Sequence, residues 1–278
     1  ELAIHGATPA ANVARTISAA GPVSQLSNAA ASGLMAIGEA AEWIRRDGCS
    51  IAVAGGADAP IYRQLFDDFN ARGWLTHGND DPASAARPWD VQRDGFALGE
   101  GAAMVVLEDE DFATRRGARA LAYVDGYGAT FNRAPVAHPA ANAIDAARAI
   151  QAALIEWSVT LQSEIDVIFC SASGGKLDAI EGQAIRRVWG PNTDKVSCTA
   201  IKSGIGHTLG ASGALGAVVA INSLRHGLIP PTLNLREQDP DCGQLQVVTG
   251  ESRRFDGNKA LVNAFGVGHS ASLIVSRP

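Results

Sequence analysis

The chain contains Arg87-Pro88-Trp89-Asp90, then Arg93-Asp94-Gly95-Phe96, then Gly99-Glu100-Gly101-Ala102, with two residues between successive blocks. As local structure, this stretch is a glycine-rich turn that leads into a strand. Its charged residues are expected to fix a loop beneath a site. That structural interpretation describes the stretch but does not explain so long a pattern of charged, aromatic and glycine residues. The stretch is the most specific in the chain, and the fold assignment starts from it.

The rest of the chain alternates between strand-like and helix-like patterns, which predicts α/β layers. Strands are predicted at residues 50–56, 101–108, 121–127, 166–170, 259–264 and 271–276, and helices at 29–46, 144–157 and 210–224. The first strand ends in glycines and is expected to be buried and parallel. Gly48 is the expected C-cap of the helix before it. A strand–glycine–helix unit around 25–60 recurs around 166–225, which indicates duplication with a seam at 115–118.

Composition and charge exclude several classes of function. The 278 residues are 46% hydrophobic and carry a net charge of −6, and Lys and Arg cluster no further than pairs, so no nucleic-acid partner is expected. Four scattered cysteines without CxxC spacing predict neither a zinc site nor a disulfide framework, and they fit a reducing cytoplasm. No apolar run is long enough to cross a bilayer, so no membrane partner is expected. No metal and no other cofactor is predicted.

Residues 87–102 resemble the RPFD-x-x-RDGF-x-x-GEGA block of β-ketoacyl-ACP synthases, which belong to the thiolase superfamily. Four further stretches resemble blocks of the same family. They are Gly21-Pro22 with 28–33 (the nucleophile elbow), 201–214 (TKS-x-x-GH-x-x-GA-x-GA), 230–235 (PPT-x-N-L) and 263–268 (the NSFGFGG loop that gates the acyl tunnel).

The resemblance implies a thiolase-like fold, in which duplicated βαβαβ halves stack in αβαβα layers. Residues 1–115 would be the remainder of the N-terminal half and residues 116–278 the C-terminal half. The family places roughly a hundred or more residues before the point that matches Glu1, so the N-terminal part of the first half is expected to be missing.

The family's condensation reaction needs a cysteine thiolate at the elbow, where a helix N-terminus favours the anion. Ungapped alignment from Gly21 places Ala30 at that position, and a methyl group cannot be a nucleophile. The family's first catalytic histidine, in an N-A-H-G-T-S-T loop, maps to Cys170, and the two threonines that hold the pantetheine arm map to Ala172 and Gly174. Loss of all three features together indicates that the natural protein lacks condensing activity, rather than that an active enzyme was inactivated by engineering.

Two residues of the family's machinery are retained: Lys202 and, five positions later, His207. In a silent subunit both are interpreted as structural, held by internal hydrogen bonds. Cys170 is interpreted as a small buried residue, with a relocated nucleophile as the alternative. In the gating loop, Phe265 and Val267 occupy substrate-binding positions, although Phe265, like Trp89 and Phe96, is expected in the core. The former active site is expected to be closed by side chains.

This pattern most resembles a chain-length-factor subunit of a type II polyketide or aryl-polyene synthase. Such a subunit lacks the nucleophile and pairs with an active ketosynthase, whose tunnel it shapes, and the acyl carrier protein is engaged through that partner. Many chain-length factors carry Gln at the elbow, whereas this chain has Ala30. Two alternatives stay open. One is an active 3-oxoacyl-ACP synthase that condenses or decarboxylates with an engineered or atypical site, and the other is a scaffold that only binds an acyl or carrier partner.

Overall fold

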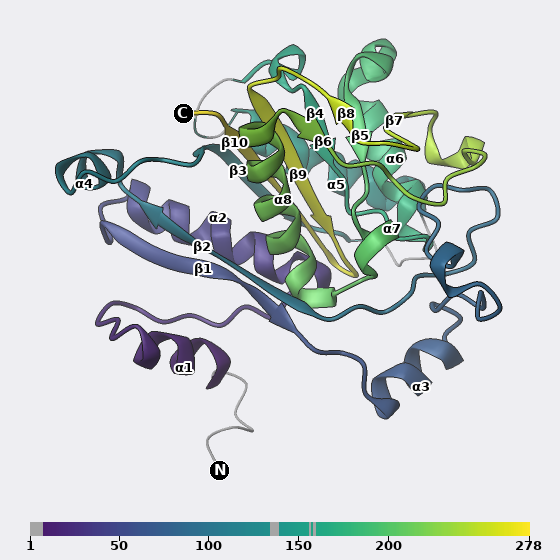
Figure 1. Cartoon of the computed structure of the whole chain (residues 1–278), viewed down its shortest axis with the longest axis horizontal. Coiled ribbons are helices and arrows are strands. Elements are labelled where there is room, and N and C mark those ends of the chain that lie inside the picture. The colour runs from purple at the N-terminus through teal and green to yellow at the C-terminus, as the bar shows by residue number, and fades with distance from the viewer. Residues whose placement is uncertain (1–7, 134–138, 156, 158–159) are drawn as a thin grey trace.

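The computed structural model describes residues 8–133, 139–155, 157 and 160–278, and it stacks sheets and helices in alternating layers (Figure 1). A two-stranded sheet is followed by a layer of two helices, α2 and α8. A six-stranded sheet and a second helix layer, α5 and α6, come next. Helix α1 lies beyond the two-stranded sheet (Figure 1).

The longer helices are α1 (Thr8–Thr16), α2 (Ser32–Arg45), α3 (Arg63–Ala71), α5 (Pro139–Ile155), α6 (Leu177–Trp189) and α8 (Ser212–His226), with short helices α4 (Glu110–Arg115) and α7 (Lys202–Ile205). The strands are β1 (Ile51–Asp58), β2 (Gly101–Glu108), β3 (Tyr123–Phe131), β4 (Val167–Phe169), β5 (Ser197–Thr199), β6 (Leu228–Ile229), β7 (Gln246–Val247), β8 (Arg253–Arg254), β9 (Lys259–Phe265) and β10 (His269–Ser276). Single 3₁₀ turns precede two of the helices: η2 (Ala29–Ala31) and η6 (Leu209–Ala211).

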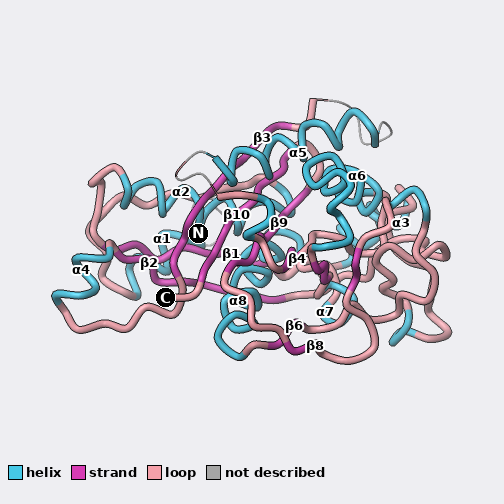
Figure 2. The backbone as a smooth tube through the Cα atoms, turned by 90° about the horizontal axis from the view of Figure 1, so that it is seen from above, coloured by secondary structure: helices cyan, strands magenta, loops and turns pink. Residues whose placement is uncertain are grey.

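The six-stranded sheet has the order β3-β10-β9-β4-β5-β7, and its central strands run side by side in Figure 2. Strands β4, β5, β7 and β9 are parallel, whereas β10 is antiparallel to both β9 and β3. Strands β4 and β5 are buried throughout, and β9 and β10 are buried after their first residue, as expected for a sheet covered by helices on both faces. This sheet therefore forms the centre of the core.

A 3₁₀ turn, a helix and an antiparallel strand pair occur twice in the chain. The first copy is η2-α2-β1-β2 and the second is η6-α8-β9-β10. Each turn begins with a non-glycine residue at positive φ, Ala29 at 51° and Leu209 at 40°. The duplication predicted from the sequence is present, but its second copy spans residues 209–276 rather than 166–225.

The two copies meet where glycines allow very close approach. A Cβ atom on Gly33 would lie 2.8 Å from the carbonyl oxygen of Gly210, and one on Gly56 would lie 2.6 Å from the same oxygen. Distances under about 3 Å are not found for real Cβ atoms, so both positions require glycine. The starts of α2 and η6 are thereby packed together with the end of β1.

Most predicted elements are present, and β2 has the bounds that the sequence predicted. The prediction for residues 50–56 was partly wrong, because β1 pairs with β2 antiparallel and is only half-buried among the described residues. The left-handed residue after α2 is Asp47, with φ of 57°, rather than Gly48. Helices α1, α3, α4 and α6 and strand β5 were not predicted.

Candidate active site

The elbow turn puts Ala30 at the edge of a hollow. Ser32 holds the backbone of this turn. Its hydroxyl donates to the carbonyl of Ala29 at 2.7 Å and accepts from the N–H of Asn28 at 2.8 Å. Ala29 tolerates its positive φ of 51° because packing of α2 against β1 and η6 fixes the turn. Ala30 lines the hollow, although only 4% of the residue is exposed.

His207 lies across the same hollow and has a defined tautomer. Its Nδ1 accepts a hydrogen bond from the N–H of Leu209 at 3.1 Å, and Nδ1 also lies 3.1 Å from the hydroxyl of Ser212. An Nδ1 that accepts leaves the proton of the neutral ring on Nε2. Burial, reinforced by the charge of Lys202, lowers the pKa of His207 well below its usual range. The ring is therefore neutral at pH 7.

An aromatic row continues the wall beside His207. The ring of Phe96 meets His207 edge-on at a centroid distance of 4.9 Å, Phe69 meets Phe96 at 5.8 Å, and Trp74 lies 5.3 Å from Phe69. All four side chains line the hollow. Phe96 was predicted in the core, but it is half-buried and faces this space instead, whereas Trp89 is fully buried as predicted.

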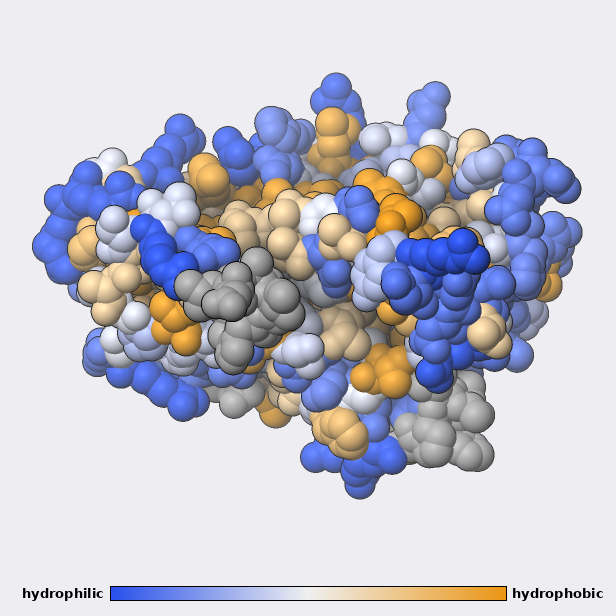
Figure 3. All heavy atoms as spheres, turned by 90° about the horizontal axis from the view of Figure 1, so that it is seen from below, coloured by the Kyte–Doolittle hydropathy of each residue, from blue (hydrophilic) through white to orange (hydrophobic). Residues whose placement is uncertain are grey.

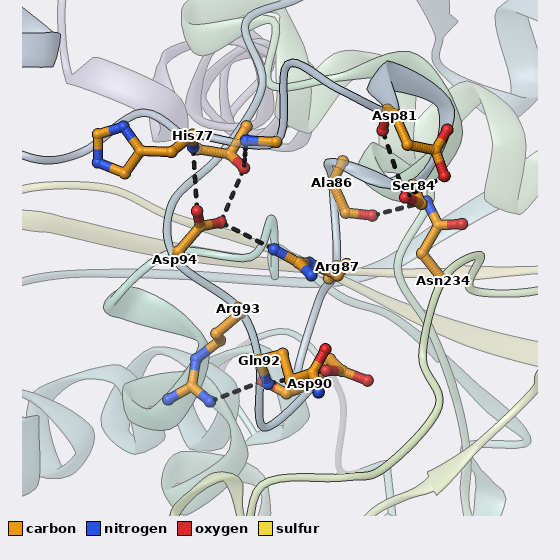
Figure 4. A network of polar contacts seen from close by, with 12 residues as sticks. His77, Asp81, Ser84, Ala86, Arg87, Asp90, Gln92, Arg93, Asp94 and Asn234 are labelled. Atoms are coloured by element: carbon orange, nitrogen blue, oxygen red, sulfur yellow. Dashed lines mark hydrogen bonds and ion pairs between the residues drawn. The ribbon is translucent and has the colours of Figure 1, made fainter.

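The charged residues of the fold-deciding stretch fix the loop that carries Phe96 (Figure 4). Asp94 accepts from the hydroxyl of Thr76 at 2.7 Å, the N–H of His77 at 3.0 Å and the guanidinium of Arg87 at 3.2 Å. These contacts lower the pKa of Asp94 against the opposing effect of its burial. The prediction that these charges hold a loop beneath a site is confirmed.

Lys202 lies behind the hollow, almost fully buried. Its ammonium donates to both the carbonyl and the hydroxyl of Ser171. Burial lowers the pKa of Lys202, and the nearby carboxylate of Glu181 opposes that shift. Glu181 in turn accepts from the N–H of Ser171 at 2.9 Å and from the side chain of Asn263 at 3.1 Å, and its burial raises its pKa. The predicted internal hydrogen bonds of Lys202 and His207 are present.

Cys170 is buried and does not line the hollow. Its thiol contacts the carbonyl of Ile168 at 3.5 Å. Burial, with further contributions from Cys198 and Glu181, raises the pKa of the Cys170 thiol well above its usual range. Because the thiolate is the nucleophile, this environment disfavours the relocated-nucleophile alternative.

The hollow has a volume of about 1540 Å³ and extends from the elbow to the space between α1 and the outer face of β1 and β2. Seen from below, apolar residues gather in the middle of the face and hydrophilic ones surround them (Figure 3). Within the described residues, Ala30 and Val267 both border this space, and the expectation that side chains close the former active site stays a prediction.

The structure thus divides the six residues singled out from the sequence into two groups. Ala30, His207 and Val267 line the hollow, whereas Cys170, Lys202 and Phe265 lie behind it in buried positions. Within the described residues, no three His, Cys, Asp or Glu side chains lie close enough to bind a metal ion. Among the helices that the structure describes, none is long and apolar enough to cross a membrane.

Two family models together match most of the chain. The model described as "Beta-ketoacyl synthase, N-terminal domain" matches residues 3–113, and the one described as "Beta-ketoacyl synthase, C-terminal domain" matches residues 121–236. The chain belongs to the β-ketoacyl synthase family. This assignment agrees with the elbow, the retained His207 and the layered fold.

Curated relatives and solved structures support the same family. The chain is 38% identical to 3-oxoacyl-[acyl-carrier-protein] synthase 2 of Rhizobium meliloti, covering 92% of this chain and 61% of the relative. It is also 38% identical to the tetracenomycin polyketide synthase ketoacyl synthase alpha subunit of Streptomyces glaucescens, covering 96% and 62%. The chain spans about three fifths of the length of the curated relatives it matches.

Two solved structures superpose closely on this member of the β-ketoacyl synthase family. A β-ketoacyl synthase from Burkholderia phymatum has a TM-score of 0.92 at 35% identity, covering 98% of this chain and 65% of that one. The ishigamide ketosynthase/chain length factor has a TM-score of 0.89 at 35% identity, covering 99% and 66%.

Proposed function

We propose that this chain is part of a catalytically silent, chain-length-factor-type subunit that pairs with an active ketosynthase and shapes its acyl tunnel. The observation that carries the proposal is the methyl of Ala30 at the elbow, where the family motif places the nucleophilic cysteine. Cys170, at the position of the first histidine, is buried outside the hollow and cannot act on a substrate there. Two parts of the catalytic machinery are thus absent together.

Pairing with a homologous ketosynthase is proposed from the family resemblance, which places the apolar residues near the elbow in an interface. Val23, Ile51 and Val53 are between 38% and 51% exposed. They lie in the segment before the elbow and in β1, the two regions that the family's dimers are expected to bury. The ishigamide ketosynthase/chain length factor, similar over nearly the whole chain, is by its name such a pair. An obligate interface of this kind buries on the order of 2,000 Å² or more.

The carrier protein would be engaged through the partner in a cytoplasmic polyketide or fatty-acid-like pathway. A similar solved structure at 28% identity is a type II polyketide acyl-carrier protein in complex with its ketosynthase, which supports that class of partner. We further propose that residues 1–115 belong to the N-terminal half of the family's fold and residues 116–278 to the C-terminal half. The end of the N-terminal family match at residue 113 supports this boundary.

The test is acylation of the full-length protein. Purified protein, alone and with a type II ketosynthase, is incubated with acyl- and malonyl-carrier protein, and intact mass and CO2 release are measured. We expect no acyl adduct on this chain and no CO2 release above that of the ketosynthase alone. An adduct on any of its residues would overturn the proposal. Any adduct should be mapped by peptide, because Cys49 also lines the hollow.

A second candidate is an active condensing or decarboxylating enzyme. It is favoured by one observation: a neutral His207 lines the same open hollow as Ala30. This enzyme would bind a malonyl thioester beside His207 and release CO2 without forming an acyl-enzyme. CO2 release by the protein without any ketosynthase, abolished in His207→Ala, would establish this alternative.

A further inference from the structure

The hydroxyl of Ser171 is bonded to its full capacity. It accepts from the N–H of Phe265 at 3.0 Å and from the ammonium of Lys202 at 3.1 Å, and it donates to the carbonyl of Phe265 at 3.2 Å. A serine hydroxyl has one proton and two lone pairs, so these three contacts use all of them. Both polar groups of the Phe265 backbone are thereby attached to one side chain.

Ser171 is itself held rigidly from two other elements. Its carbonyl accepts from Lys202 of α7, and its N–H donates to Glu181 of α6. Glu181 also accepts from Asn263 of β9, which ties the same helix to the strand that ends at Phe265. Both contacts go to Oε1 of Glu181, whereas its Oε2 has no hydrogen-bond partner among the described residues. The contacts of Ser171 to α6, α7 and β9 nevertheless fix its position from three sides.

Phe265 is the last residue of β9 and directly precedes the loop Gly266–Gly268. The loop lies against the elbow, because a Cβ atom on Gly266 would be 3.0 Å from the amide nitrogen of Ala30. Its far end is also fastened, since Asn132 donates its N–H to the carbonyl of Gly268 at 2.8 Å. Val267, at the tip, is 45% exposed and lines the hollow.

We propose that Ser171 is a clamp that fixes the loop Gly266–Gly268 in one conformation beside Ala30, so that Val267 forms a rigid part of the hollow's wall. Ser171 is a positioning residue, because its side chain does not line the hollow. In the N-A-H-G-T-S-T loop that this segment resembles, glycine stands at the position of Ser171 and offers no hydroxyl. The clamp does not depend on whether the subunit is silent or active.

Hydrogen exchange of the full-length protein, resolved by residue, tests the clamp. In Ser171→Gly, exchange of the Phe265 amide and of the loop amides should rise by about tenfold, as expected for the loss of one hydrogen bond. The amides of Leu261 and Val262 in the middle of β9 should keep their protection. Ser171→Thr, which retains the hydroxyl, should restore slow exchange at Phe265.

Ser173→Ala is the matched control, because Ser173 lies in the same segment and its hydroxyl makes no hydrogen bond to the described residues. It should leave exchange at Phe265 unchanged. Unchanged exchange in Ser171→Gly would overturn the clamp, because strand pairing and the contacts of Asn132 would then be sufficient to hold the loop. Equal loss of protection throughout β9 would also overturn it, because Ser171 would then stabilise the sheet rather than the loop.

Discussion

The backbone N–H of Leu209 donates a hydrogen bond to Nδ1 of His207 across 3.1 Å. Leu209 reaches this position with a φ of 40°, a conformation that is strained for a side chain branched at Cγ. The fold therefore maintains a left-handed residue two positions after the histidine, and the ring in turn accepts a hydrogen bond from its partly buried N–H group. His207 is built into the turn that begins η6, which suits a structural role and also sets its tautomer.

Replacing His207 by Ala should lower the free energy of unfolding by about 1–3 kcal/mol, because the Leu209 N–H and the Ser212 hydroxyl lose a partner. In the proposed silent subunit, product formation per folded complex should change little. The melting temperature and the product rate are measured in complex with an active ketosynthase. A variant that is folded, equally stable and inactive would contradict the silent-subunit proposal.

The contribution of His207 should also depend on pH. Its pKa is depressed in the folded protein, so the unfolded chain binds a proton at this ring in acid before the folded protein does. The stability that depends on the neutral ring is complete above the unfolded pKa of about 6.5 and is lost as pH falls below it. His207→Asn keeps an acceptor for Leu209 but does not titrate.

As pH falls from 7 to 5, the unfolding free energy of the wild type should therefore decrease relative to that of His207→Asn. Denaturant unfolding at several pH values measures it. Glu181 has a raised pKa and the opposite pH dependence, but it is present in both proteins and its effect cancels in the difference. A difference that stays constant over this range would contradict a buried, neutral His207.

The fold was predictable where the sequence pattern and the packing agree. Strand β2 was predicted with its observed bounds because GAAMVVLE is a continuous run bounded by a glycine turn. Helix α6 was missed because Asp178 and Glu181 interrupt its apolar face, and both carboxylates are buried against the backbone of the segment 171–174. Helix α3 was missed because none of its residues is buried, so its sequence carries no apolar face that packs against a core.

The residues of the site were predictable where they belong to motifs of fixed spacing along the chain. Ala30 and His207 were found from motifs, and the structure places both on one hollow. Phe96 was assigned to the core because an aromatic residue gives no local sign that it faces a cavity rather than an interior. Ser171 was not singled out, because its partners Lys202 and Phe265 lie 31 and 94 residues further along the chain.

Gly33→Ala tests the close approach of the two duplicated units. The new methyl would lie 2.8 Å from the carbonyl oxygen of Gly210 and 3.0 Å from the Cβ of Ala214. Overpacking of this kind costs about 1–3 kcal/mol, which outweighs the higher helix propensity of Ala. The denaturation midpoint should fall accordingly. Gly21→Ala is the control, because no atom lies within 4 Å of its Cβ position, and a midpoint equally lowered in both variants would contradict the packing argument.

The last prediction concerns restoration of the elbow nucleophile. In Ala30→Cys the new thiol should line the hollow, as the methyl does now, and should be alkylated by iodoacetamide. Condensation in the full-length protein should nevertheless stay at background. In the motif alignment, the first histidine position falls on Cys170, which is buried away from the hollow, and the threonine positions expected to hold the pantetheine arm fall on Ala172 and Gly174.

The single variant is compared with Ala30→Ser and with the double variant Ala30→Cys/Cys170→His. Intact mass reports alkylation and acylation, and product analysis with malonyl-carrier protein reports condensation. The double variant should also stay low, because the hydroxyl contacts to the carrier arm are still missing. Alkylation without acylation would show that the thiol is present and accessible but that a nucleophile alone is insufficient. Condensation by Ala30→Cys at the rate of an active ketosynthase would mean that the remaining residues form a complete site, and the inferred losses at 170, 172 and 174 would then have no catalytic consequence.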